Sequence, residues 1–281
     1  MASRKPWRKV LYERQPYPDN YTDKKVFLRD LKKNIDFREV TYLEAVLGAS
    51  LLLQEFCTVV AFVLIYFYMV NKWVPPTAVF QWTSFLTVLC FAYHLLRFSR
   101  DVREKLGHDL RTVLTFVVFG ELFSPVLHTL TDTISTDTIH TTAFLMMLVH
   151  LVFFDYGVSA AIVSGSLSLS AAVFASICLA SRLSSAREAF ILMTVATEAF
   201  VLFPLLRNDM QKPVFITFVL LVSDTYFLYL IGNLATTLFL STVVLVTVIC
   251  PVLFVRYQKY KDNIYGPWDE AVVDDVDNPF D

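Results

Sequence analysis

The segment SAAIVSGSLSLSAAVFASICLA, residues 159–180, carries the clearest structural signal in the chain. It contains no charged residue, and small side chains recur at every fourth position. Small residues allow two helix backbones to approach closely in a membrane, and serine can also hydrogen-bond across the contact. We therefore expect a transmembrane helix over 158–181 that packs centrally in a bundle or against another subunit. Its predicted packing residues are Ala160, Ser164, Ser168, Ala172, Ser176 and Ala180.

Long apolar stretches recur from Val46 to Val255. The chain has 281 residues, of which 56% are hydrophobic, and its mean hydropathy is +0.53. A soluble globular domain is typically only about 45–50% apolar. Since about 20 apolar residues can cross the hydrocarbon core as a helix, we predict an all-α integral membrane protein, a polytopic bundle of about eight transmembrane helices. The predicted spans are 46–70, 77–96, 112–128, 139–154, 158–181, 188–206, 214–231 and 234–255.

Basic residues collect on one side of the predicted membrane. With eight spans, both termini lie on that side, together with the loops at 97–111, 155–157 and 207–213. The opposite side receives three of the 24 Lys and Arg residues, which are Lys72, Arg182 and Arg187. Because loops that stay in the cytosol carry an excess of Lys and Arg, we predict that both termini are cytosolic.

The two ends of the chain differ from its apolar middle. After Asp23, which can cap a helix, Phe27, Leu31 and Ile35 recur every four residues among five basic side chains. This pattern predicts a basic amphipathic helix, which lies in the membrane interface or packs on a partner subunit. The predicted regions are a cytosolic N-terminal segment, an eight-span domain and an acidic cytosolic tail, at 1–44, 45–255 and 256–281.

Acidic residues interrupt four predicted spans, at Glu55, Glu121, Glu198 and Asp224. Ionisable groups are costly in hydrocarbon and usually mark a bundle interior, a cavity or a partner. No Lys or Arg lies well inside a span, so we expect these acids to lack a cation within the chain. Gly120 and Pro125 predict an irregular helix around Glu121. The candidates for lipid or partner contact are Arg97, Arg100, Arg103, Lys105, Arg111, Glu121, His150, Asp155 and Asp224.

Catalytic signals are weak in this sequence. His150 and Asp155 are about 140° apart on an ideal helix, so we expect no acid–base dyad from them. The sequence has no nucleophile elbow, P-loop or dinucleotide fingerprint. The four cysteines have no metal-ligand spacing, and we expect no catalytic residue, no metal, no cofactor and no nucleic-acid partner. The residues favour a non-catalytic membrane subunit; the alternative is a polytopic lipid transporter or scramblase, or an intramembrane lipid enzyme.

Four segments together resemble one protein family along nearly the whole chain. They are WRKVLYERQPYPDNYTD at 7–23, FSPVLHTLTDTISTDTI at 123–139, HLVFFDYGVSAAIVSGSLSLSAAVFASICLASRL at 150–183 and NIYGPWDEA at 263–271. In the same order, they are similar to the PIG-C family, the membrane subunits of phosphatidylinositol N-acetylglucosaminyltransferase that bear the letter C. The resemblance implies a complex in the endoplasmic reticulum membrane that transfers N-acetylglucosamine from UDP-N-acetylglucosamine to phosphatidylinositol. This reaction is the first step of glycosylphosphatidylinositol (GPI) anchor synthesis.

The resemblance also implies partners and a division of labour. Sugar transfer in this complex is assigned to its catalytic subunit, designated A, and PIG-C proteins have no known active site. We therefore expect the chain to contact that catalytic subunit, the other subunits, phosphatidylinositol and membrane lipid, as a scaffold or by presenting phosphatidylinositol. The basic residues of 97–111 are the expected attraction for its phosphodiester.

The polar stretch FSPVLHTLTDTISTDTIH, residues 123–140, first suggests chemistry. The span count places 129–138 on the lumenal side, across the membrane from the sugar donor, unless the segment re-enters the bilayer. We expect a turn between the third and fourth spans, with Thr136 and Asp137 capping the next helix.

Overall fold

The computed structural model describes residues 14–18, 21, 32–34, 38–97, 102–129, 131, 133–157, 163–209 and 213–265. These residues are mostly helical, which confirms the all-α prediction. The chain divides into two units: residues 42–252 form one, and residues 1–41 with 253–281 form the other.

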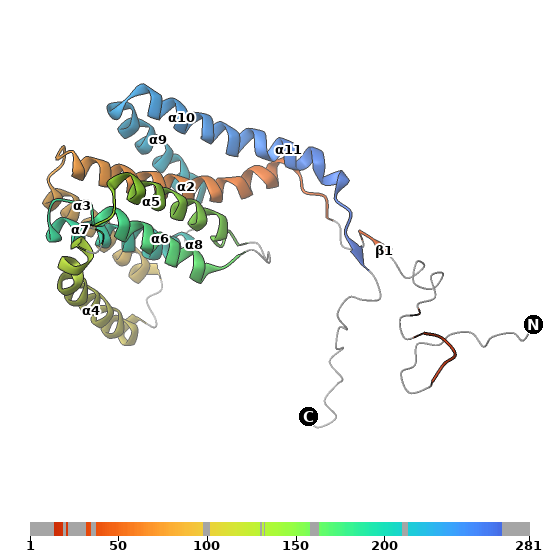
Figure 1. The fold of residues 1–281 in the computed structure, drawn as a ribbon, viewed down its shortest axis with the longest axis horizontal. Coiled ribbons are helices and arrows are strands. Elements are labelled where there is room, and N and C mark those ends of the chain that lie inside the picture. The colour runs from red at the N-terminus through yellow and green to blue at the C-terminus, as the bar shows by residue number, and fades with distance from the viewer. Residues whose placement is uncertain are drawn as a thin grey trace, which may run out of the picture. The chain divides into compact units, whose positions relative to one another are not determined.

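Helices account for almost all of the larger unit, and Figure 1 labels most of them. A π-helical segment, η1 (Glu198–Leu202), joins α7 to α8, and a second, η2 (Leu245–Ile249), joins α10 to α11. The helical stretches therefore fall where the eight spans were predicted. Their bounds are α2 (Tyr42–Val70), α3 (Pro76–Arg97), α4 (Val102–Thr129), α5 (Thr136–Phe153), α6 (Gly165–Ala180), α7 (Ala186–Thr197), α8 (Phe203–Asp209), α9 (Pro213–Ile231), α10 (Asn233–Val244) and α11 (Cys250–Tyr257).

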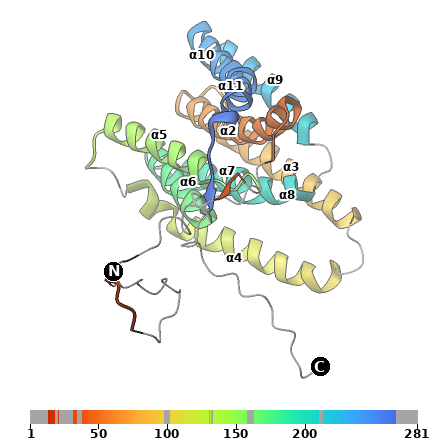
Figure 2. The same cartoon turned by 90° about the vertical axis from the view of Figure 1, so that its right-hand side faces the viewer.

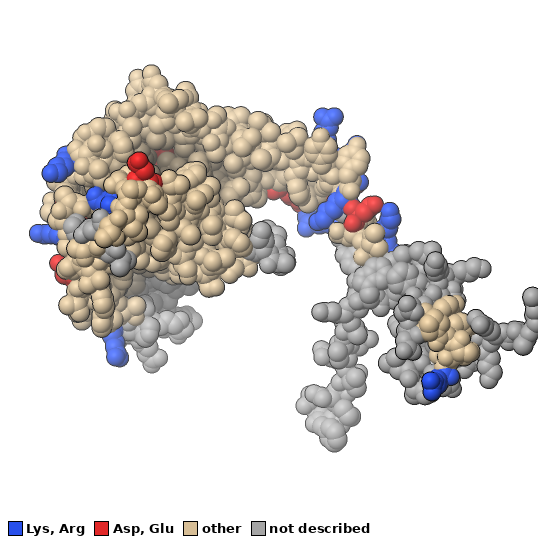
Figure 3. All heavy atoms as spheres, in the orientation of Figure 1, with Lys and Arg blue, Asp and Glu red and all other residues tan. Residues whose placement is uncertain are grey.

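Four stretches of the described chain are helices long and apolar enough to cross a membrane: Tyr42–Val70, Thr136–Phe153, Ala186–Arg207 and Asn233–Tyr260. Shorter apolar helices cover Pro76–Ala92, Gly165–Ala180 and Phe215–Ile231. The predicted span at 112–128 lies within α4, which is not among these helices. Figure 3 shows few charged side chains on the visible face of the helices, as expected of a surface covered by lipid or protein.

Helix α2 lies between two layers of the larger unit. On one side it packs against α9 and η2, and on the other against α5, α7 and η1. Figures 1 and 2 both show α2 between the α9–α10 pair and the α5–α7 group. Phe62 and Met69 point into the α5–α7 side of the core, and Leu53 and Leu64 point into the α9–α10 side.

Helix α6 packs closely against α5, and also against α7. Four of the six predicted packing residues are buried in it, Ser168, Ala172, Ser176 and Ala180, with at most 2% of each exposed. Ser164 instead precedes the helix in an extended conformation, and Ala160 lies outside the described residues. The helix was predicted to begin at 158, but residues 163–164 are not helical. A role for the small residues in subunit assembly stays a prediction.

The polar turn between α4 and α5 is held by the chain itself. Ser135, not Thr136 or Asp137, is the cap of α5, because its hydroxyl accepts a hydrogen bond from the Thr138 N–H. The predicted cap residues lie in the first turn of the helix, where Asp137 faces the positive end of the helix dipole. Arg182, from the α6–α7 turn, donates hydrogen bonds to the carbonyls of Thr131 and Ile134.

Two prolines accompany the two π-helical segments. Pro204 and Pro251 each follow a π segment after one intervening residue. Proline has no N–H and its ring crowds the carbonyl four residues earlier, which disturbs a regular helix. In α4, by contrast, the helix continues through Pro125, although an irregular helix was predicted there.

The smaller unit joins the N- and C-terminal segments. Strand β1 (Lys32–Lys33) pairs antiparallel with β2 (Ile264–Tyr265). Lys33 forms an ion pair with Asp262 at 3.0 Å. The predicted amphipathic helix is therefore wrong at Lys32 and Lys33, because tertiary pairing makes them a strand. Its other positions, 22–31 and 35–37, lie outside the described residues.

Side-chain amides reinforce this pairing. Gln258 accepts from the Val40 N–H and donates to the Val40 carbonyl, each at 3.0 Å. Asn263 donates its N–H to the Asn34 side chain, and Asn34 donates its own N–H to the Asn263 carbonyl. Asn34 has φ +53°, a left-handed conformation that asparagine tolerates better than most residues. The ends of the chain are thus tied by backbone contacts that apolar burial does not explain.

Candidate functional site

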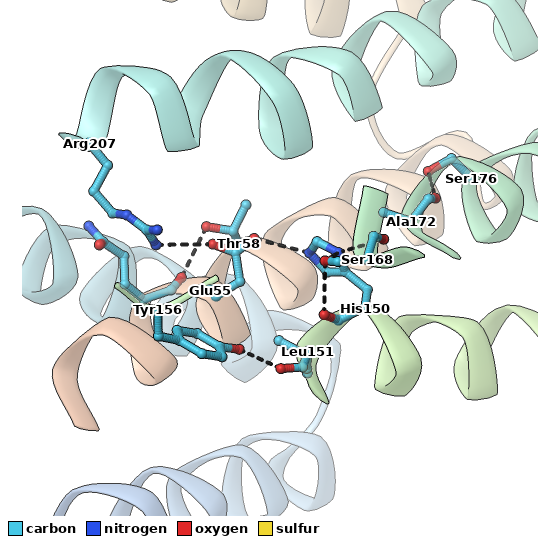
Figure 4. A network of polar contacts seen from close by, with 10 residues as sticks. Glu55, Thr58, His150, Leu151, Tyr156, Ser168, Ala172, Ser176 and Arg207 are labelled. Atoms are coloured by element: carbon cyan, nitrogen blue, oxygen red, sulfur yellow. Dashed lines mark hydrogen bonds and ion pairs between the residues drawn. The ribbon is translucent and has the colours of Figure 1, made fainter. Parts of the chain in front are cut away.

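A polar cluster lies buried where four helices of the larger unit meet. Glu55 comes from α2, His150 from α5, Ser168 from α6 and Arg207 from α8. Their exposed fractions are 0%, 1%, 2% and 7%. Figure 4 shows their side chains turned toward one another between the helices. Burying this many polar groups is costly unless each finds a partner.

Glu55 is the centre of the cluster. His150 Nε2 lies 3.1 Å from Glu55 Oε1, and an Arg207 guanidinium nitrogen lies 3.2 Å from Glu55 Oε2. Both carboxylate oxygens are therefore engaged, one by an imidazole and one by a cation. The expectation that the acids lack a cation within the chain is wrong for Glu55. Arg207 went unrecognised because it lies just beyond the predicted span 188–206, and 152 residues from Glu55.

Ser168 joins α5 to α6 through His150. Its hydroxyl donates to the His150 carbonyl at 3.1 Å and lies 2.9 Å from His150 Nδ1, which is also 3.0 Å from the Ser168 carbonyl. The hydroxyl has one proton, which it donates either to the His150 carbonyl or to an unprotonated Nδ1, whereas a protonated Nδ1 donates to the Ser168 carbonyl. Nε2 pairs with Glu55 only as an N–H donor, because a carboxylate oxygen accepts. Ser168 was predicted from its small size, but its hydroxyl has an equal part in the contact.

Aromatic rings enclose the cluster. The Arg207 guanidinium lies 5.0 Å from the centre of the Phe154 ring, a cation–π arrangement. Phe154 and Phe200 both present rings edge-on to His150, at 5.5 and 5.0 Å between centroids. Rings keep water away, so the electrostatic attraction between Arg207 and Glu55 is screened less than at a surface.

Tyr156 closes the end of the cluster in the loop after α5. Its hydroxyl donates to the Leu151 carbonyl at 2.7 Å. Burial raises the pKa of the Tyr156 phenol, and the negative charge of Glu55 raises it further. The phenol therefore stays protonated and keeps donating its hydrogen bond.

The connectivity from Ser168 through His150 to Glu55 resembles the relay of a serine hydrolase, but its setting does not. A nucleophilic serine must reach its substrate, and Ser168 is 2% exposed between α5 and α6. Its hydroxyl already donates to the chain's own backbone. The cluster is therefore arranged to hold four helices together. Among the described residues, no group of three or more His, Cys, Asp or Glu side chains could hold a metal ion.

Two further polar residues are buried, Gln54 on α2 and Asp224 on α9. Gln54 is 0% and Asp224 2% exposed. The Cys57 thiol lies close to the Asp224 carboxyl. Both amide atoms of Gln54 and one oxygen of Asp224 have no hydrogen-bond partner among the described residues. Asp224 was a predicted contact residue, and the structure places it inside the chain.

Three other predicted residues have separate roles. Asp155 is exposed and accepts a hydrogen bond from the Gly157 N–H at 2.8 Å, so it shapes a turn and forms no dyad with buried His150. Gly157 has φ +79°, which favours glycine. Glu198, at the start of η1, lies close to Thr83 and Thr87 of α3. Glu121 is exposed on α4.

The predicted basic contacts fall at the end of α3 and the start of α4. Arg111 is exposed on α4. Arg97, Arg103 and Lys105 lie in helices, but their side chains are outside the described residues, as is all of Arg100. Lipid contact by these five residues stays a prediction.

Comparison with known proteins identifies the family. Residues 7–269 match the model of the GPI2 family, described as phosphatidylinositol N-acetylglucosaminyltransferase. Proteins named as the subunit of this enzyme with the letter C are similar along 95% of the chain and 93% of their own length: 42% identical in Bos taurus, 41% in Mus musculus and 40% in Homo sapiens. No solved structure is significantly similar to the chain. The match covers three of the segments that carried the resemblance and residues 263–269 of the fourth, and the chain belongs to the GPI2 family, the PIG-C subunits of phosphatidylinositol N-acetylglucosaminyltransferase.

Proposed function

We propose that the chain is a non-catalytic membrane subunit of the complex that transfers N-acetylglucosamine from UDP-N-acetylglucosamine to phosphatidylinositol, the first step of GPI-anchor synthesis. Its place is the endoplasmic reticulum membrane, with eight spans and both termini in the cytosol. Relatives that match along nearly their whole length are named as one subunit of this transferase. The proposal of a non-catalytic role rests on the closed polar cluster. Its side chains make hydrogen bonds and ion pairs with one another, and they are Glu55, His150, Ser168 and Arg207.

The position of the cluster supports a role at the cytosolic face. The end of α5, the start of α6 and the end of α8 lie on the side that the span count assigns to the cytosol. The Glu55–Arg207 pair therefore braces the helix ends nearest the proposed site of sugar transfer. In this role the bundle holds the acyl chains of phosphatidylinositol and presents its inositol to the catalytic subunit of the complex. Basic residues of 97–111 attract its phosphodiester.

Crosslinking tests lipid presentation. Purified complex is irradiated with a photoreactive phosphatidylinositol, and the labelled polypeptides are separated. We expect label on this chain, and less of it when Arg103, Lys105 and Arg111 are replaced by Gln in an intact complex. Label confined to the partner subunits would leave only the scaffold role.

Turnover per assembled complex tests the non-catalytic role. Cells deficient in PIG-C receive the unmodified chain or Ser168→Ala, and surface GPI-anchored protein is measured together with complex abundance. We expect rescue by the unmodified chain, and an activity for Ser168→Ala that follows abundance alone. A loss of more than about 100-fold per assembled complex, the scale seen for catalytic groups, would make Ser168 catalytic. Failure of the unmodified chain to rescue would favour the transporter alternative.

Glycosylation tests the proposed topology. An acceptor sequence inserted beside Ser135 is expected to be modified, since the span count places that turn in the lumen. The native sequon at Asn20-Tyr21-Thr22 should stay unmodified because the N-terminus is cytosolic. The opposite pattern would invert the proposed orientation.

A further inference from the structure

Helix α4 presents an unusual surface. Leu114, Val117 and Val118 are 62%, 42% and 55% exposed. They lie seven, four and three residues before Glu121, so all four share one side of the helix. Pro125, four residues further on, extends the same side and is also exposed. This set of five residues is the Glu121 face.

The side of α4 that borders the Glu121 face packs against α7. A Cβ at Gly120 would lie 2.9 Å from the ring of Phe190. Ser124 is 2% exposed and donates its hydroxyl to the Ala186 carbonyl. Because successive residues are about 100° apart around a helix, Glu121 lies beside this contact. Close packing of Gly120 and Ser124 holds α4 in place, while Glu121 itself stays exposed.

Glu121 offers two acceptors at one point. Its carboxylate has no hydrogen bond or ion pair within the described chain. Pro125 has no N–H, so it cannot make the regular helical bond to the Glu121 carbonyl. An Arg side chain carries several N–H donors in a fixed fork, and a Lys carries three donors. Either could bind the carboxylate and the carbonyl together.

Water and lipid are both poor surroundings for this face. Contact with water is unfavourable for the exposed valines and leucine, and exposed apolar patches of this kind usually mark interaction sites. A carboxylate without a counter-charge is costly in hydrocarbon. A protein surface that is apolar around one basic side chain satisfies both requirements.

We propose that the Glu121 face binds a transmembrane helix of a partner subunit, which presents a Lys or Arg side chain to Glu121 and its free carbonyl. This inference rests on the proposed function, in which the chain is one subunit of a complex. The surface would set which partner binds α4, since the charge fixes the register of an otherwise uniform apolar contact.

Site-specific crosslinking tests the occupant. A photoreactive amino acid replaces Val118 on the Glu121 face or, as a control, Phe123 on another exposed side of α4, in cells that contain the whole complex. We expect Val118 to give an adduct with a partner polypeptide that is absent or weaker from Phe123. Adducts with lipid alone, or with a second copy of this chain, would overturn the proposal.

Charge substitution tests the mechanism. We expect Glu121→Lys to lower recovery of that partner about tenfold in affinity purification, the scale of a lost polar contact between membrane helices. Glu121→Gln should have a smaller effect, and the matched control Asp137→Asn, an exposed carboxylate on α5, should have none. An acidic substitution at the partner's crosslinked basic residue should restore binding to Glu121→Lys.

The two proposals fail in different ways. If the unmodified chain does not restore surface GPI-anchored protein, the proposed function fails. If it does, and Glu121→Lys recovers the partner as well as the unmodified chain, the docking proposal alone fails.

Discussion

Gln54 and Glu55 are neighbours on α2, yet their surroundings differ sharply. Both are fully buried. Glu55 points toward α5, α6 and α8, where His150 and Arg207 engage both of its oxygens. For Gln54, neither amide atom has a hydrogen-bond partner among the described residues. Adjacent buried positions on one helix thus differ, because the side-chain oxygens of Glu55 are paired and the amide atoms of Gln54 are not.

The difference shows that burial of a polar group does not reveal its contribution to stability. Glu55 is stabilising only while its partners are present, because an unpaired buried charge is expensive. Gln54 incurs the cost of losing water without gaining a hydrogen bond. We therefore expect substitutions at the paired and the unpaired position to have opposite consequences.

Loss of Arg207 should have the largest effect. Arg207→Met removes the counter-charge of Glu55 and leaves a buried carboxylate with only His150, at a cost of about 3–5 kcal/mol. The free energy of unfolding, measured by SDS titration of the purified chain in mixed micelles, should fall by this amount.

The matched control is the double variant Glu55→Gln with Arg207→Met. Gln still reaches His150 but carries no charge, so stability should partly return. A double variant that is no better than Arg207→Met alone would mean that shape, not charge, holds α8 in place.

Ser168→Leu should have the next largest effect. The larger side chain must fit where α5 and α6 approach closely, and the hydrogen bonds to His150 are lost, so we expect a loss of about 3 kcal/mol. Unfolding of Ser168→Leu is compared with that of Ser170→Leu, at an exposed position of the same helix. Equal stability of the two variants would show that the α5–α6 contact tolerates bulk.

Cys57→Ala extends the comparison to the α9 side. It removes a fully buried thiol beside the Asp224 carboxyl, and we expect a loss of about 1–2 kcal/mol. Cys57→Ser keeps a donor beside this carboxyl and should be milder in the same unfolding measurement. If both variants cost the same, packing rather than a polar contact with Asp224 is the main contribution of Cys57.

Gln54→Met should have the smallest effect, and in the opposite direction. Methionine fills a similar volume without polar atoms, so the unfolding free energy should stay within about 0.5 kcal/mol or rise. A loss comparable to that of Arg207→Met would contradict this expectation and would mean that Gln54 has a polar partner beyond the described residues.

Local features of the sequence predicted the helices well. Long apolar runs need no distant partner, so the helical stretches fall at all eight predicted spans. Helix starts were less accurate, since the cap of α5 is Ser135 and α6 begins only at Gly165. These details depend on which side chain reaches a free N–H, and several candidates stand side by side in the sequence.

The polar cluster was only partly predictable. His150 was singled out by its rarity in an apolar segment, and Ser168 by its spacing. The pairing of Glu55 with Arg207 depends on bringing α2 against α8, which no local pattern encodes. Lys32 and Lys33 show the same effect, because a strand partner near residue 264 overrides their helical pattern.

The ion pair between Lys33 and Asp262 can form only late in the synthesis of the chain. These residues are 229 positions apart. A ribosome adds about 5–20 residues per second, so the early strand waits roughly 10–50 s for its partner. During that time the whole helical region between them is translated. Pairing of Lys33 and Asp262 therefore requires that translation has passed through every helix of the larger unit, and a product truncated before Asp262 would lack the partner of its first strand.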